Sequence, residues 1–178
     1  LNMKAPQTRQ ISFIVKNPTG HNLNIKLSPE VEGVTVKKDA KNPAKRIIVE
    51  VDAPSVLGDN WDKGAELNFT LSVNCEKEPD KTHSIDFNVY ISPNSTPIIL
   101  KQIDGLVADK LGETLKFNLD GVFFDNDGES LSYSISDTEL GVFSMNGSQL
   151  TFTASSYGSD EISVSAADMF GASISGTL

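Results

Sequence analysis

Five acidic residues in the C-terminal half have the type and spacing to bind a metal ion. Asp125, Asp127 and Glu129 alternate along the turn DNDGE, and the glycine of this turn lets the chain bend tightly. Carboxylates that converge in this way suit a hard cation such as Ca²⁺, which takes roughly six to eight oxygen ligands. Asp120 before the turn and Asp168 in a later turn could complete the shell. The sequence therefore predicts a calcium site formed by these five residues.

The same acidic turn has an interpretation that needs no metal. Aspartates in turns also accept hydrogen bonds from nearby backbone amides and cap strands. The turn lacks the terminal bidentate glutamate of an EF-hand loop. At the level of sequence, both interpretations stay open.

The remaining residues with useful chemistry do not form a catalytic pattern. His21 and His83 have no acidic or serine partner at a spacing typical of a catalytic triad, so turn or surface positions are expected. Cys75 is the only cysteine; it cannot form an intramolecular disulfide and is expected to be a partly buried thiol. Trp61 lies in a Gly/Asp loop, where it could contact a ligand such as a sugar or anchor the loop. The chain itself is therefore predicted not to be an enzyme.

Charge is distributed unevenly along the chain. Residues 1–96 carry 12 basic and 12 acidic residues, whereas residues 97–178 carry 3 lysines and 12 acids and so hold the whole net charge of −9. This asymmetry predicts a domain boundary near residue 96, and its sign argues against a nucleic acid partner. No apolar run is long enough to span a membrane, and no secretory signal opens the chain. Because residue 1 is Leu rather than Met, we expect a processed product or a part of a longer protein.

Apolar residues alternate with polar ones in short runs, which is the pattern of half-buried β-strands. No run has a helical period of useful length. Asn146-Gly147 predicts a tight hairpin. Residues 1–9, 53–64 and 76–82 lack the alternation and are expected to form a lead-in, a loop and a hairpin loop. The runs cover residues 11–15, 23–27, 34–36, 47–51, 67–73, 85–91, 98–103, 115–119, 131–135, 142–145, 150–154, 162–166 and 172–178.

Short strands with turns every 8–12 residues or so are typical of β-sandwiches, and the length of the chain suits two of them. Pro93 and Pro97 lie in the segment SPNSTP, which predicts a short, semi-rigid linker. The predicted organisation is an all-β chain with one β-sandwich at 1–92, a linker at 93–97 and a second β-sandwich at 98–178.

A set of spaced motifs covers residues 113–178. They are Phe124-x-Asn126-Asp127-Gly128 before an L-x-Y strand, Leu150-x-Phe152, Tyr157-Gly158, and Ala167-Asp168-x-x-Gly171-Ala172. In this pattern the segment resembles the dystroglycan-type cadherin-like module of bacterial surface and secreted proteins. It departs from the family at Glu129, where Asp is usual, and in LTFTASSYG, which replaces the usual FSGTP stretch.

Residues 10–91 are similar, more loosely, to the immunoglobulin-like module that precedes such a domain. The pair resembles the C-terminal appendage of secreted subtilisin-like serine peptidases from gut Bacteroidetes. The resemblance implies two tandem immunoglobulin-like and cadherin-like β-sandwiches outside the cytoplasm. It also implies a non-catalytic role as a spacer, docking or stabilising appendage of a larger secreted or surface protein, in which other domains of the parent chain are the partners.

The alternative function is an independent adhesion or carbohydrate-binding module that contacts a host or cell-surface protein or glycan. Such a module would use loop residues such as Trp61 and the acidic turn. An exposed aromatic platform around Trp61 would favour glycan binding. A broad apolar patch on the first domain would instead favour docking to another domain or protein.

Overall fold

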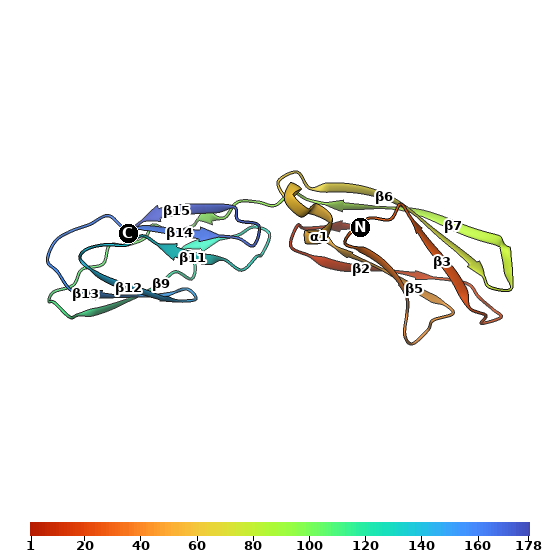
Figure 1. Ribbon diagram of the computed structural model, residues 1–178, viewed down its shortest axis with the longest axis horizontal. Helices are drawn as coiled ribbons and strands as arrows, with labels where there is room; N and C mark the ends of the chain where they lie inside the picture. The colour runs from red at the N-terminus through yellow and green to blue at the C-terminus, as the bar shows by residue number, and fades with distance from the viewer. The chain divides into compact units, whose positions relative to one another are not determined.

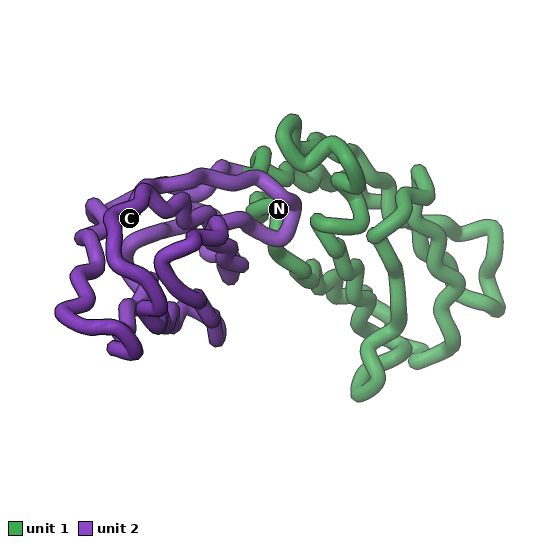
Figure 2. The backbone as a smooth tube through the Cα atoms, turned by 60° about the vertical axis from the view of Figure 1, so that its left-hand side comes forward, with its two compact units in different colours: residues 1–94 green, residues 95–178 purple.

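The computed structural model describes residues 1–178 and confirms an all-β protein. The chain forms two compact units, Leu1–Asn94 and Ser95–Leu178 (Figure 2). In each unit the strands lie in layers (Figure 1), and the buried apolar side chains of the strands form the core. No helix in the structure is long and apolar enough to cross a membrane.

Unit 1 is a β-sandwich of a four-stranded and a three-stranded sheet, in the orders β1-β7-β6-β3 and β2-β5-β4. Alternate residues of each strand face the core, where Ile47 and Val49 of one sheet and Phe69 of the other are at most 2% exposed. Phe13 and Phe87 join the sheets, with ring centroids 5.1 Å apart. The strands are β1 (Asn2–Met3), β2 (Thr8–Ile14), β3 (Leu23–Ser28), β4 (Val34–Lys38), β5 (Arg46–Asp52), β6 (Ala65–Cys75) and β7 (Glu78–Ile91).

Three segments of unit 1 differ from the predicted loops. Residues 1–9 contain the short strand β1, which pairs in parallel with β7, and the start of β2. Residues 53–64 contain a helical turn, α1 (Ala53–Leu57), followed by the 3-10 turn η1 (Gly58–Asn60). Pro54 favours this start because its fixed φ suits the first turn of a helix. Residues 76–82 are mostly strand, because the β6–β7 hairpin turns at Glu76–Lys77 and β7 begins at Glu78.

Unit 2 contains two three-stranded sheets, β11-β14-β15 and β12-β13-β9, and the short pair β10-β8. The tight hairpin at Asn146-Gly147 is confirmed, since Asn146 pairs with Gln149 and Gly147 has a φ of +60°. The core lies around Leu119, Phe123 and Val164. The strands are β8 (Ile98–Ile99), β9 (Thr114–Asn118), β10 (Phe123–Phe124), β11 (Ser132–Ile135), β12 (Gly141–Asn146), β13 (Gln149–Ala154), β14 (Ser163–Ala167) and β15 (Ser173–Thr177).

Candidate metal centre

Three of the five predicted ligands come together at one end of unit 2. Asp125 and Glu129 lie in the turn between β10 and β11, and Asp168 lies in the turn between β14 and β15. Because β11 and β14 are antiparallel, with Ser132 opposite Ala167, the start of one strand adjoins the end of the other. One carboxylate oxygen from each of the three acids lies within 4.8 Å of the other two.

Each of the two aspartates uses one oxygen to hold its own turn. The backbone N–H of Asp127 donates to Asp125 Oδ1 over 2.7 Å. Asp168 Oδ1 accepts from the backbone N–H groups of Phe170, at 2.8 Å, and Ala172, at 2.9 Å. The acidic residues therefore do accept hydrogen bonds from nearby backbone N–H groups, as the metal-free interpretation expects. In Asp125 these bonds use only one of the two carboxylate oxygens.

Three other carboxylate oxygens, from Asp125 and Glu129, are buried without a hydrogen-bond donor. Asp125 is 3% exposed and Asp168 is 6% exposed. Asp125 Oδ2 and both carboxylate oxygens of Glu129 are buried and accept no hydrogen bond. A buried carboxylate oxygen without a donor or cation destabilises the fold, because it has lost its hydrogen bonds to water and formed none in their place. A cation bound at the cluster would compensate for this loss.

The pKa of Glu129 is raised by its position in this cluster. Burial raises the pKa of its carboxyl from 4.5 to about 7, and the negative charges of Asp168 and Asp125 add to the rise. The backbone N–H of Met169 lowers this pKa, although the contact lacks the geometry of a regular hydrogen bond. Asp127 contributes a smaller repulsion. Without a cation, Glu129 therefore stays partly protonated up to near pH 7, and a bound cation would offset the same repulsion.

The three carboxylates fit a hard cation. Ca²⁺ binds oxygens at roughly 2.3–2.6 Å, so two ligands on opposite sides of the ion lie about 5 Å apart. The separations of up to 4.8 Å lie inside that limit. The cluster offers only oxygen and no imidazole or thiolate, which suits Ca²⁺ better than zinc or copper.

The two other predicted ligands are not part of this triplet. Asp127 lies nearby, but its Oδ2 accepts a hydrogen bond from the backbone N–H of Ser95 over 2.6 Å. Asp120 is exposed, and burial together with the charge of Asp120 raises the pKa of Tyr133. Sequence spacing placed Asp120 near the turn, whereas the path of the chain through β10 separates it from the three clustered acids.

The remaining candidate residues occupy separate positions in unit 1. Trp61 follows η1 and is half-buried, and its backbone carbonyl accepts from the Asn94 N–H over 2.8 Å. His21 is half-buried in a loop, His83 is exposed on β7, and Cys75 is half-buried at the end of β6. None of these residues belongs to the carboxylate cluster, and Trp61 does not form an exposed aromatic platform.

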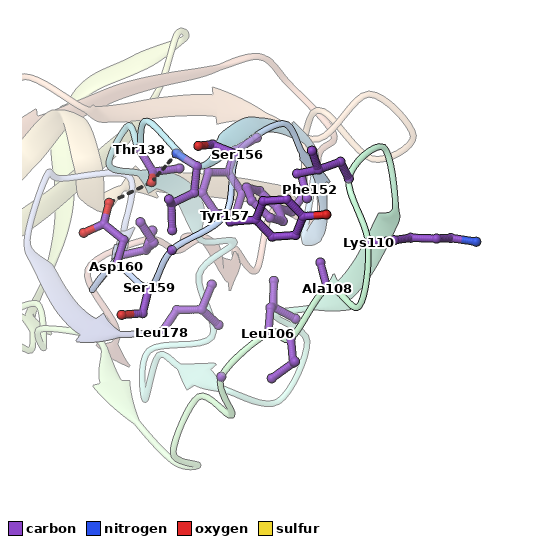
Figure 3. A pocket seen from close by; sticks show the side chains of 18 residues that line it. Leu106, Ala108, Lys110, Thr138, Phe152, Ser156, Tyr157, Ser159, Asp160 and Leu178 are labelled. Atoms are coloured by element: carbon purple, nitrogen blue, oxygen red, sulfur yellow. Dashed lines mark hydrogen bonds between the residues drawn. The ribbon is translucent and has the colours of Figure 1, made fainter.

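A second concave feature of unit 2 was not predicted as a site. It is a groove of about 310 Å³, lined by apolar side chains that include Phe143, Phe152 and Leu178 (Figure 3). Tyr157 borders it and is 78% exposed. Asp160 accepts a hydrogen bond from the Thr138 hydroxyl at its rim, 2.7 Å long. The motif Tyr157-Gly158 was visible in the sequence, but nothing in its spacing indicated a groove.

No protein-family model matches this chain, and no curated protein matches it. Several solved structures match over 99% of its length. One is an endo-fucoidan hydrolase from glycoside hydrolase family 107, at 12% identity and a TM-score of 0.47, of which the chain covers 26%. The human desmocollin-1 ectodomain matches at 17% identity and a TM-score of 0.42, with 38% of that chain covered.

The titin domains Z1Z2, solved in complex with telethonin, match at 11% identity and a TM-score of 0.42, with 88% of that chain covered. The chain spans about a quarter of the length of the endo-fucoidan hydrolase. Identities and TM-scores this low do not allow the functions of these proteins to be transferred. The β-sandwich architecture rests instead on the strand pairing and burial described above.

Proposed function

We propose that this chain is a non-catalytic, extracytoplasmic tandem of β-sandwich modules whose second module binds Ca²⁺. Its role is to space, stabilise or dock a larger secreted or surface protein. The observation that carries the proposal is the cluster of Asp125, Glu129 and Asp168, with its buried oxygens that lack donors. A cation there joins the turn before β11 to the turn after β14, and so fixes one end of the module.

The chemistry of the cluster also bears on location. Calcium sites of extracellular modules have dissociation constants of about 10⁻⁴–10⁻³ M. A site of that affinity fills only where Ca²⁺ is in the millimolar range, so a measured dissociation constant of this order would support a secreted or cell-surface location.

Differential scanning calorimetry with CaCl₂ and with EGTA tests the proposal. If the dissociation constant is about 0.1 mM, 10 mM CaCl₂ stabilises unit 2 by roughly 2.7 kcal/mol, which raises its melting temperature by about 10 °C or more. The variant Glu129→Gln keeps the shape of the side chain and should lose most of this shift. Asp120→Asn is the matched control and should retain it.

Two results would contradict the calcium proposal. One is an unchanged melting temperature of the wild-type chain between EGTA and CaCl₂. The other is an equal response in Glu129→Gln and wild type, which would place the bound ion elsewhere. Because MgCl₂ at the same concentration controls for general ionic effects, it should produce a much smaller shift.

We propose further that the larger protein is a subtilisin-like serine peptidase, to which this tandem is an appendage. The support for this is the sequence resemblance of the two modules. An immunoblot of the native source with an antibody against this chain tests it. A band far larger than 19.2 kDa that carries peptidase activity supports the proposal, and a band of the chain's own size contradicts it.

A second candidate function is an independent adhesion or carbohydrate-binding module. The groove beside Tyr157 favours it, because an exposed ring above an apolar floor with hydroxyl groups at the rim suits the two faces of a sugar. Trp61, half-buried, is a poorer candidate for this contact. A glycan array probed with wild type and with Tyr157→Ala tests this function, since specific binding should be lost in the variant.

A further inference from the structure

One side of β7 is an open sheet edge. From His83 to Ile91 β7 pairs regularly with β6, and the register shifts between His83 and Glu78, whereas on the other side β1 pairs only with Tyr90 and Ile91. The Leu1 amino group also donates to the carbonyl of Asn88. From Glu78 to Phe87 the strand therefore has no second neighbour, and Figure 1 shows the β6–β7 hairpin continuing beyond β1.

The direction of the open backbone groups follows from the ladder. In an antiparallel strand, the N–H and C=O of one residue point to the same side, and successive residues alternate. Because Asn88 and Tyr90 bond to Leu1 on the open side, Ser84 and Asp86, which lie in the regular part of the ladder, point their backbone groups to that side as well. Neither residue has a strand partner there. Two donors and two acceptors are therefore aligned for an incoming strand.

A groove runs beside this edge. Its volume is about 980 Å³, and its apolar lining includes Phe13 and Val15 on one side and Leu71, Val73 and Ile85 on the other. Ile85 lies on the core-facing side of β7, in register with Leu71, yet it is 52% exposed. Further along the same face, Val89 is fully buried. Ile85 is a core-type position that nothing covers.

The charged residues that line the groove are mostly basic. They are Lys16, Lys77 and Lys81 against a single acid, Glu78, which forms an ion pair with Lys81 at 3.0 Å. The carboxylate of Asp86 accepts from the Thr70 hydroxyl across the β6–β7 pair and is not directed into this groove. The groove therefore complements a segment that carries acidic residues as well as apolar ones.

Proteins usually protect an open edge with lysine or proline. Here Pro79 and Lys81 occupy the part of β7 nearest the hairpin turn. The stretch from Thr82 to Asp86 contains neither residue type. The protection therefore covers the tip of the hairpin and leaves the section beside Ile85 open.

We propose that a partner protein adds an extended segment to the edge of β7 as a further strand. The segment pairs with Ser84 and Asp86, inserts alternate apolar side chains beside Ile85, and carries acidic residues at the end that lies near Lys77 and Lys81. Backbone pairing supplies affinity, and the groove supplies specificity. The surface belongs to unit 1, so this proposal is independent of the calcium site in unit 2.

The probe is a fluorescein-labelled synthetic octapeptide that alternates valine with threonine and ends in two glutamates, measured by fluorescence anisotropy at low salt. Ser84→Pro removes an outward N–H and leaves the β6 ladder intact, because proline is tolerated on an edge strand when its missing N–H faces outward. Ser84→Ala is its matched control, since it keeps that N–H. Ile85→Lys tests the groove at a half-exposed position where folding should be preserved. Trp61 fluorescence during urea unfolding verifies that each variant is folded.

Wild type and Ser84→Ala should bind the peptide, and Ser84→Pro and Ile85→Lys should each weaken binding about tenfold or more. A peptide that ends in two lysines in place of the two glutamates should also bind about tenfold more weakly. Absence of binding to wild type, or equal binding by all folded variants, would overturn the proposal. Self-association of the wild type in analytical ultracentrifugation that Ser84→Pro abolishes would also overturn it, because the occupant would then be a second copy of this chain.

Discussion

At the scale of single residues, Glu129 concentrates the chemistry of unit 2. Its two carboxylate oxygens are buried without a donor beside Asp125 and Asp168. Asp125 and Asp168 also accept hydrogen bonds from backbone N–H groups of their own turns, so these two residues stabilise the turns even without a cation. Glu129 accepts no hydrogen bond from its turn, and it is the residue whose pKa is raised. A raised pKa of this kind is typical of a residue that binds a ligand.

The pH dependence of stability follows from Glu129. In the unfolded chain this carboxyl loses its proton near its ordinary pKa of 4.5, and in the folded, calcium-free protein it keeps the proton until about pH 7. Between these values the folded state holds more protons, so the free energy of unfolding falls as pH rises. In EGTA we expect the melting temperature of unit 2 to decline from about pH 5 to pH 7.5.

Calorimetry across this pH range with Glu129→Gln provides the control. Because glutamine has no proton to lose, the variant should show a flatter profile in EGTA and be more stable than wild type at pH 7.5. Added CaCl₂ should stabilise the wild type more at pH 7.5 than at pH 5, since the ion competes with the proton. A wild-type profile as flat as that of the variant would contradict the role assigned to Glu129.

At the scale of elements, the connection between η1 and β6 depends on Gly64. This residue has a φ of +67°, and a Cβ added to it would lie 2.5 Å from the carbonyl oxygen of Ile91 and 2.8 Å from the nitrogen of Pro93. The close approach packs the start of β6 against the end of β7. Gly20 has the same φ of +67° but open space around it.

We therefore expect Gly64→Ala to destabilise unit 1 far more than Gly20→Ala. Gly20→Ala places an alanine in the left-handed backbone conformation, which lowers the stability by about 1–2 kcal/mol. Gly64→Ala adds to this a clash of the new Cβ with backbone atoms of Ile91 and Pro93, which cannot move aside easily. Urea unfolding followed by Trp61 fluorescence measures both variants in the same unit. Equal losses of stability would show that the packing of Gly64 is looser than described.

At the scale of the whole molecule, each unit has a core of its own. Leu150 is fully buried in unit 2, and Ile47 is fully buried in unit 1. Trp61, the only tryptophan of the chain, belongs to unit 1. Its fluorescence therefore reports the unfolding of unit 1, whereas circular dichroism reports the loss of strands in both units.

Leu150→Ala should lower the stability of unit 2 by about 2–5 kcal/mol, the usual cost of truncating a buried leucine. The Trp61 fluorescence transition should stay where it is in wild type, while the circular dichroism transition becomes broader or biphasic. Ile47→Ala should instead shift the fluorescence transition. If Leu150→Ala shifted the fluorescence midpoint as much as Ile47→Ala, the units would unfold together.

Much of the architecture could be predicted from the sequence, because it depends on local signals. The alternation of apolar residues determines the all-β class, and Asn146-Gly147 determines a hairpin, since both act over a few neighbouring residues. The short helix α1 was missed because five residues are too few to show a helical period. The same local pattern placed Ile85 on a core-facing position, but it could not show that no strand covers it.

The tertiary structure alone decided which acids meet. All five predicted ligands were visible in the sequence, and Asp120 and Asp168 were both candidates to complete the shell. The pairing of β11 with β14 brings Asp168 to Asp125 and Glu129, because it joins two turns that lie about 40 residues apart. The type of each side chain is local information, whereas convergence on one point depends on the long-range pairing of strands.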